Sequence, residues 1–209
     1  MKTIKTLLLS ISVAALILTG CAQRVSQGNI PTDAEVIEMS EILSNSSSLV
    51  DSIVSFKGVI KHICSSTSNT AFAFDPDNDS LMVRCIASSA IYGLFPDDVM
   101  DKNVIIKGML REERMDESWL KDIEYQYKIH SEKYGVTDPS DSLVQLGIRR
   151  CRYERRYRGQ DSIQDFDEYL ADFRQRIENA KEATGKNYLS FYYLEVISVD
   201  SLESDSNGR

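Results

Sequence analysis

Two segments with the same pattern, fifty residues apart, most restrict how this chain can fold. They read VSFKGVI at residues 54–60 and VIIKGML at residues 104–110. Runs of β-branched, aromatic and aliphatic residues favour strands. A glycine inside such a run commonly marks a bulge or a sharp bend in a barrel. The pair therefore predicts a small, strongly curved sheet that bends near Gly58 and Gly108.

Three further strands are predicted around these two. Residues 70–74 (TAFAF) and 81–86 (LMVRCI) flank an aspartate-rich turn and predict a hairpin. A short apolar connector at residues 90–96 leads to the second glycine strand. Residues 188–197 (YLSFYYLEVI) have the same strand character and supply a fifth strand.

The segment between the fourth and fifth strands predicts helices. One helix carries apolar residues at three- and four-residue spacing up to Gly135, a second carries Cys151, and a third begins at Asp161 or Ser162 and ends near Gly185. A further helix over residues 32–44 is expected before the first strand. The chain thus combines a curved sheet with a long helical insertion.

The order of these strands resembles the OB-fold domains of bacterial envelope proteins, over residues 50–112 and 187–199. The resemblance implies an α+β fold: a five-stranded OB-fold-like β-barrel with a helical insertion, about residues 116–184, between strands four and five. The domain would span residues 33–199, and the polar residues 200–209 would form a flexible tail.

The first residues predict where in the cell the protein is located. Lys2 and Lys5 precede an apolar run at residues 7–18, which is short for a membrane span, and the run ends in Leu-Thr-Gly-Cys21. This tetrad resembles the lipobox of bacterial lipoproteins. The resemblance implies a signal peptide at residues 1–20, a palmitoylated Cys21, a tether at residues 21–32, and anchoring to the outer membrane, facing the periplasm.

Charge narrows the function classes. The net charge of −8 would become −10 once the two lysines of the signal peptide are removed. Such a negative net charge disfavours a protein that coats nucleic acid, although the OB-fold resemblance keeps nucleic-acid binding as an alternative.

The chain carries no Gly-rich phosphate loop, nucleophile elbow or HExxH motif, so a non-catalytic protein without a cofactor is expected.

One pair of residues suggests a metal or redox site as an alternative function. His62 and Cys64 lie two apart on a strand and therefore project from one face. They could bind zinc or copper together with Cys85, Cys151 or His130, and the candidate set is His62, Cys64 and Cys85. A Cys64–Cys85 disulfide, or a histidine beside a small buried cysteine, would explain the same residues without a metal.

The run RRCRYERRYR at residues 149–158 holds six arginines in an acidic chain. Guanidinium groups interleaved with tyrosines can bind a phosphorylated polymer through bidentate contacts and ring stacking. The run could equally be a solvated helix face paired with the acidic residues 161–178. The leading hypothesis is a non-catalytic module that binds an envelope protein or an anionic glycan through Arg149, Arg152, Tyr153, Arg156 and Tyr157.

Overall fold

The computed structural model describes residues 35–65, 68–134, 151–163 and 165–202. The expected signal peptide, Cys21, the tether and most of the expected second helix lie outside these residues. No helix of the described segments is both long and apolar enough to cross a membrane. The elements are α1 (Met39–Ser44), α2 (Ser46–Leu49), β1 (Ile53–Ile63), β2 (Thr70–Phe74), β3 (Met82–Ala87), the 3-10 turns η1 (Ser89–Ile91) and η2 (Asp97–Val99), β4 (Asn103–Asp116), α3 (Glu117–Tyr134), α5 (Arg152–Arg158), α6 (Phe166–Thr184) and β5 (Tyr188–Ser201).

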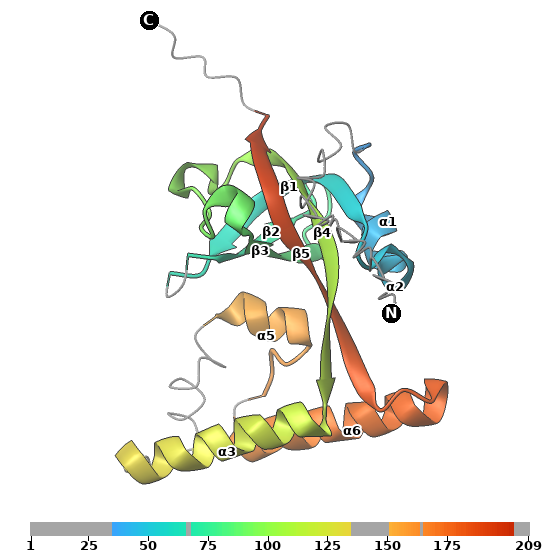
Figure 1. Cartoon of the computed structure of the whole chain (residues 1–209), viewed down its shortest axis with the longest axis vertical. Helices are drawn as coiled ribbons and strands as arrows, with labels where there is room; N and C mark the ends of the chain where they lie inside the picture. Colours follow the sequence, from blue (N-terminus) through green and yellow to red (C-terminus); the bar gives the residue numbers. More distant parts are fainter. Residues whose placement is uncertain (1–34, 66–67, 135–150, 164, 203–209) are drawn as a thin grey trace, which may run out of the picture. The chain divides into compact units, whose positions relative to one another are not determined.

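The five strands form a closed barrel in the order β1-β2-β3-β5-β4 (Figure 1). Neighbouring strands are antiparallel except β3 and β5, which pair in parallel. Helix α3 follows β4 directly, so helical residues lie between strands four and five. The predicted α+β class and the five-stranded OB-fold-like barrel with a helical insertion are therefore confirmed.

Alternating residues of the strands fill the barrel. On β3 the side chains of Val83, Cys85 and Ala87 are buried in the interior, while Arg84 points to the outer face. Strand β2 is buried on both faces, because Ala71 and Ala73 join the interior and the intervening phenylalanines pack outside. The barrel core also includes Met39, Ile42, Val54, Phe56, Ile60, Phe95, Val99, Val104, Ile106, Leu110, Leu194 and Val196.

Only one of the two strand glycines sits at an irregularity. The β4–β5 register shifts between Lys107 and Gly108, and a Cβ on Gly108 would lie 2.4 Å from the backbone oxygen of Glu195. Gly58 instead pairs regularly with Val104. Gly58 therefore marks no bulge. The register shift of β1 lies between Ile60 and His62, where one extra residue faces β2.

Strands β4 and β5 stay paired beyond the barrel, as far as Asp116 and Tyr188 (Figure 1). There α3 and α6 pack on them and form a second core, in which the Tyr127 and Phe166 rings stack at 4.0 Å. Strand β4 is thus longer than the predicted strand at 104–110, because its charged continuation pairs with β5. The other members of this second core are Met115, Leu120, Ile163, Tyr169, Leu170, Phe173, Ile177 and Phe191.

Two predicted helix starts differ from the structure. The helix expected from Thr32 begins at Met39, because Val36 forms an isolated parallel bridge with Ser55 and the Ile37 amide donates to the Ser55 carbonyl at 2.9 Å. The helix expected from Asp161 or Ser162 begins at Phe166, because the Asp165 carboxylate caps it. At the other end of the domain, β5 runs to Ser201, and residues 203–209 lie outside the described part.

Candidate functional site

The irregularity in β1 places the side chains of His62 and Cys64 on the outer face of the barrel. Ile60 faces the barrel interior, and regular alternation along β1 would turn His62 inward as well. The extra residue between Ile60 and His62 reverses this alternation, so His62 pairs with Phe72 and lies on the outer face with it. Cys64 packs in the same outer cluster as Phe72. A bulge is a common device for re-aiming side chains next to a functional site. His62 and Cys64 therefore share one face, as their spacing predicts.

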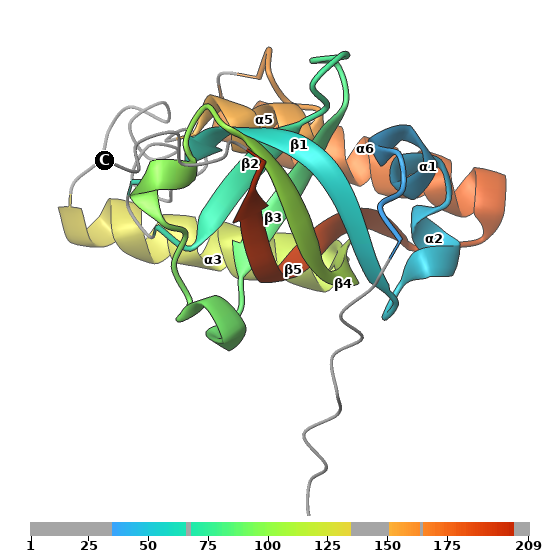
Figure 2. The ribbon, with the colours of Figure 1, turned by 90° about the horizontal axis from the view of Figure 1, so that it is seen from above.

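Helix α5 lies on this outer face, beside β1 and β2 (Figure 2). Tyr153 stacks on the His62 ring at 4.9 Å between ring centroids and also contacts Phe72 and Phe74. Cys151, the residue before α5, is buried in the same cluster. The start of α5 is thus held on the barrel by aromatic contacts, and it brings Cys151 to the end of β1.

The Nδ1 or Nε2 of His62 and the Sγ atoms of Cys64 and Cys151 all lie within 4.8 Å of one another. Both thiols are free, and His62 and Cys64 are half-buried. A hydrogen bond between the two thiols raises the pKa of Cys64, and burial raises it further. The same bond lowers the pKa of Cys151, so Cys151 is the thiol of the pair that ionises first.

Cys85, the third member of the sequence-based metal set, lies elsewhere. Its side chain is fully buried inside the barrel, where its thiol donates to the Val83 carbonyl at 3.8 Å. Burial raises its pKa to about 12. The alternation on β3 places Cys85 inward with Val83 and Ala87, whereas His62 and Cys64 face outward. The structure brings Cys151, and not Cys85, to the other two residues.

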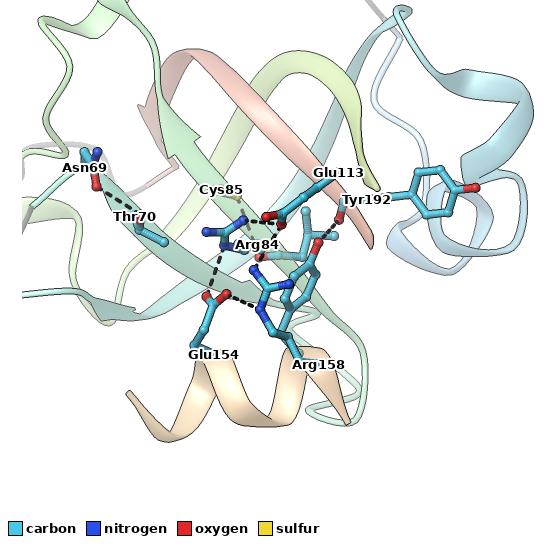
Figure 3. A network of polar contacts seen from close by, with 10 residues as sticks. Asn69, Thr70, Arg84, Cys85, Glu113, Glu154, Arg158 and Tyr192 are labelled. Atoms are coloured by element: carbon cyan, nitrogen blue, oxygen red, sulfur yellow. Dashed lines mark hydrogen bonds and ion pairs between the residues drawn. The ribbon is translucent and has the colours of Figure 1, made fainter. Parts of the chain in front are cut away.

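A ring of four alternating charges fixes the rest of α5 to the barrel (Figure 3). Arg158 contacts Glu113 at 3.0 Å and Glu154 at 2.9 Å, and Arg84 contacts the same two carboxylates at 3.3 and 3.1 Å. Burial would lower the pKa of Arg158, but Glu154 and Glu113 outweigh this effect and raise it. The ring joins β3, β4 and α5, and it sets the orientation of the helix.

A groove of about 520 Å³ opens between α5 and the β2–β3 turn. This volume falls within the range of small-molecule sites. Val59 and Pro76 form part of its lining. The other lining residues supply three cationic side chains, two aromatic rings and three carboxylates. These residues are Lys61, Arg152, Arg156, Tyr153, Phe74, Asp75, Asp79 and Asp161.

Only some residues of the arginine run line the groove. Arg152 and Arg156 are exposed in it, and Arg156 donates to the Asp79 carbonyl at 2.8 Å and covers the Phe74 ring. Tyr157 instead points inward and donates to the Tyr192 carbonyl at 2.9 Å, and Arg149 lies outside the described residues. Sequence reasoning missed Lys61 and Phe74, which line the groove from β1 and β2. The alternation of Phe74 with the interior residue Ala73 offered a signal that Phe74 faces outward.

No family model matches the chain, and searches of curated proteins and of solved structures found no match. The groove offers guanidinium donors beside flat rings, and the neighbouring cluster offers one imidazole and two thiols. The first set suits a ligand with phosphate and sugar groups, and the second suits a soft metal ion.

Proposed function

We propose that this protein is a lipoprotein, anchored to the bacterial outer membrane through Cys21 and facing the periplasm, and that its barrel is a non-catalytic module that binds an anionic envelope glycan. The observation that carries the binding proposal is the groove beside α5. Its exposed Arg152 and Arg156 guanidinium groups lie next to the Tyr153 and Phe74 rings.

The guanidinium groups of the groove favour a ligand that carries negatively charged phosphates. A planar guanidinium can bind a phosphate through two parallel hydrogen bonds, which fixes the direction of the ligand as well as its charge. Arg152 already lies over the Tyr153 ring at 4.8 Å, and its Nη2 donates to the Tyr153 hydroxyl at 2.9 Å. This contact limits the conformations of the Arg152 side chain and holds its charge at the groove.

The carboxylates of the groove restrict the ligand class. Asp75, Asp79 and Asp161 lie on the same lining as the arginines, so a polymer with a phosphate at every unit would meet repulsion there. A glycan that carries occasional phosphates avoids this, because its neutral hydroxyl groups can donate to carboxylates. This favours a phosphorylated glycan, such as lipopolysaccharide, over a nucleic acid.

The test replaces both arginines. We expect the Arg152→Gln/Arg156→Gln protein to be retained less on immobilised lipopolysaccharide, with roughly tenfold lower affinity for each arginine–phosphate pair that the substitutions remove. Removal of the phosphates from the lipopolysaccharide should weaken the binding of the wild-type protein in the same way. Retention and elution with salt measure both effects.

The matched control removes the same charge elsewhere. Lys121 and Lys128 are exposed on α3, away from the groove, and Lys121→Gln/Lys128→Gln should leave retention unchanged. Far-UV circular dichroism and thermal unfolding establish that both double variants are folded. Equal retention of the arginine variant and the wild type would show that the groove is not the glycan site.

A further inference from the structure

We propose that His62, Cys64 and Cys151 bind one thiophilic d10 metal ion, Zn²⁺ or Cu⁺, on the outer face of the barrel beneath α5. This site goes beyond the proposed glycan-binding function and does not depend on it. Within the described residues, these three form the one group of three or more histidine, cysteine or acidic side chains whose ligand atoms lie within 4.8 Å of one another.

The spacing of the donors is close to what such an ion requires. With Zn–S near 2.3 Å and Zn–N near 2.0–2.1 Å, tetrahedral coordination places its donor atoms about 3.6–3.8 Å apart. The donor atoms, which lie within 4.8 Å of one another, need to approach by at most about 1.2 Å. Rotation of the two thiol side chains about their Cα–Cβ bonds can supply such a change without moving a strand.

The backbone already holds the three residues in place. The Cys64 amide donates to the Thr70 carbonyl at 2.8 Å, and the Cys64 carbonyl accepts from the Ser68 amide at 2.7 Å. The carbonyl of Cys151 accepts from Arg155 in the first turn of α5. The His62 ring lies against Tyr153 and Phe72. Ligands fixed in this way lose little freedom on binding.

The chemistry of the donors selects the ion. Two thiolates and one neutral imidazole form a soft set that suits Zn²⁺ and Cu⁺ rather than Mg²⁺ or Ca²⁺. Two thiolates also neutralise the charge of Zn²⁺. The carboxylate of Glu154 is not part of the group, and its two oxygens already form ion pairs with Arg158 and Arg84. A water molecule could complete tetrahedral Zn²⁺, whereas Cu⁺ is satisfied by three ligands.

The experiment uses the full chain with Cys21→Ser in every sample, so that only Cys64, Cys85 and Cys151 carry thiols. The protein is reduced, and a thiol titration confirms three free thiols before metal is added. Zn²⁺ and Cu⁺ are each titrated in competition with a coloured chelator. We expect one ion per chain, and Co²⁺, which can replace Zn²⁺ in such sites, should give thiolate charge-transfer absorption.

Cys64→Ser and Cys151→Ser should each weaken binding by more than about 100-fold, since loss of a ligand exceeds the loss of a supporting contact. Cys85→Ala is the matched control, because its thiol lies inside the barrel and its removal should leave affinity unchanged. If a serine variant fails to fold, His62→Gln provides the same comparison. Binding that is absent at micromolar metal, or is equal in wild type and both serine variants, would overturn the proposal.

Discussion

At the scale of single residues, Gly108 is the glycine of the described segments at which an added side chain would meet the closest atoms. A Cβ there would lie 2.4 Å from the Glu195 carbonyl oxygen and 2.7 Å from Leu194 Cγ. The first of these is a backbone atom in the paired strand, so it cannot move without opening the β4–β5 ladder. The lack of a side chain therefore allows the two strands to approach at the register shift.

We expect Gly108→Ala to lower the free energy of unfolding by about 1–3 kcal/mol, the usual cost of overpacking a closed core. Gly58→Ala is the control, because an added Cβ there would meet its nearest atoms, Phe56 Cε2 and the Phe74 carbonyl oxygen, at 3.2 and 3.3 Å, which requires only a small shift. Urea unfolding followed by circular dichroism measures both. Equal destabilisation by the two variants would contradict this account of Gly108.

The sequence could predict two of the three residues of the thiol cluster, but not the third. Two-residue spacing on a strand correctly places His62 and Cys64 on one face, because this depends only on local geometry. The third member could not be chosen, since Cys151 reaches them through a tertiary contact of α5. Alternation on β3 does offer a signal against Cys85, because Cys85 shares the periodicity of Val83 and Ala87, which face the core.

At the scale of elements, the start of α6 depends on one carboxylate. Asp165 Oδ1 accepts from the amides of Asp167 and Glu168 at 2.8 and 3.1 Å, which satisfies two donors that the helix leaves unpaired. The sequence contains the signal, because Asp165 and Glu168 have the spacing of a capping box. The prediction of a start at Asp161 or Ser162 missed it by choosing the first polar residues before the apolar run.

Asp165→Ala should therefore reduce the free energy of unfolding by about 1 kcal/mol, because the two amides lose their acceptor. Asp165→Asn should retain most of the stability, since an amide oxygen can also cap. Asp161→Ala removes the same charge from an exposed residue outside the helix and should change stability by less than about 0.5 kcal/mol. Thermal or urea unfolding of the three variants distinguishes a capping role from a general charge effect.

The strands themselves were largely predictable, and their extensions were not. Hydrophobic runs mark all five strands of the barrel, because burial inside it demands apolar side chains. The continuation of β4 reads Arg111, Glu112, Glu113 and Arg114, which looks like a solvated loop. It is a strand because β5 pairs with it residue by residue, from Arg111 opposite Tyr193 to Asp116 opposite Tyr188. Such pairing is long-range and leaves no local hydrophobic pattern.

At the scale of the whole molecule, the anchor proposed at Cys21 would determine where the groove and the thiol cluster are located. If Cys21 is acylated, cells grown with labelled palmitate should incorporate the label into the protein, and Cys21→Ser should abolish incorporation. Cys64→Ser, which leaves the anchor intact, should be labelled like the wild type. Labelling that persists in Cys21→Ser would contradict the lipobox interpretation.

The parallel pairing of β3 with β5 has a consequence for how the protein is made. Residues 88–187 separate these two neighbours, so the barrel cannot close until the ribosome has synthesised nearly all of the described chain. Until then the facing edges of β3 and β4 carry unpaired amides and carbonyls, which can pair with other chains. Helices α3 and α6 are built from local hydrogen bonds and can form first. The synthesis of β5 is therefore the step that commits the molecule to its final form. If the protein is exported as proposed, the barrel that is still open before this step would make the chain easier to translocate.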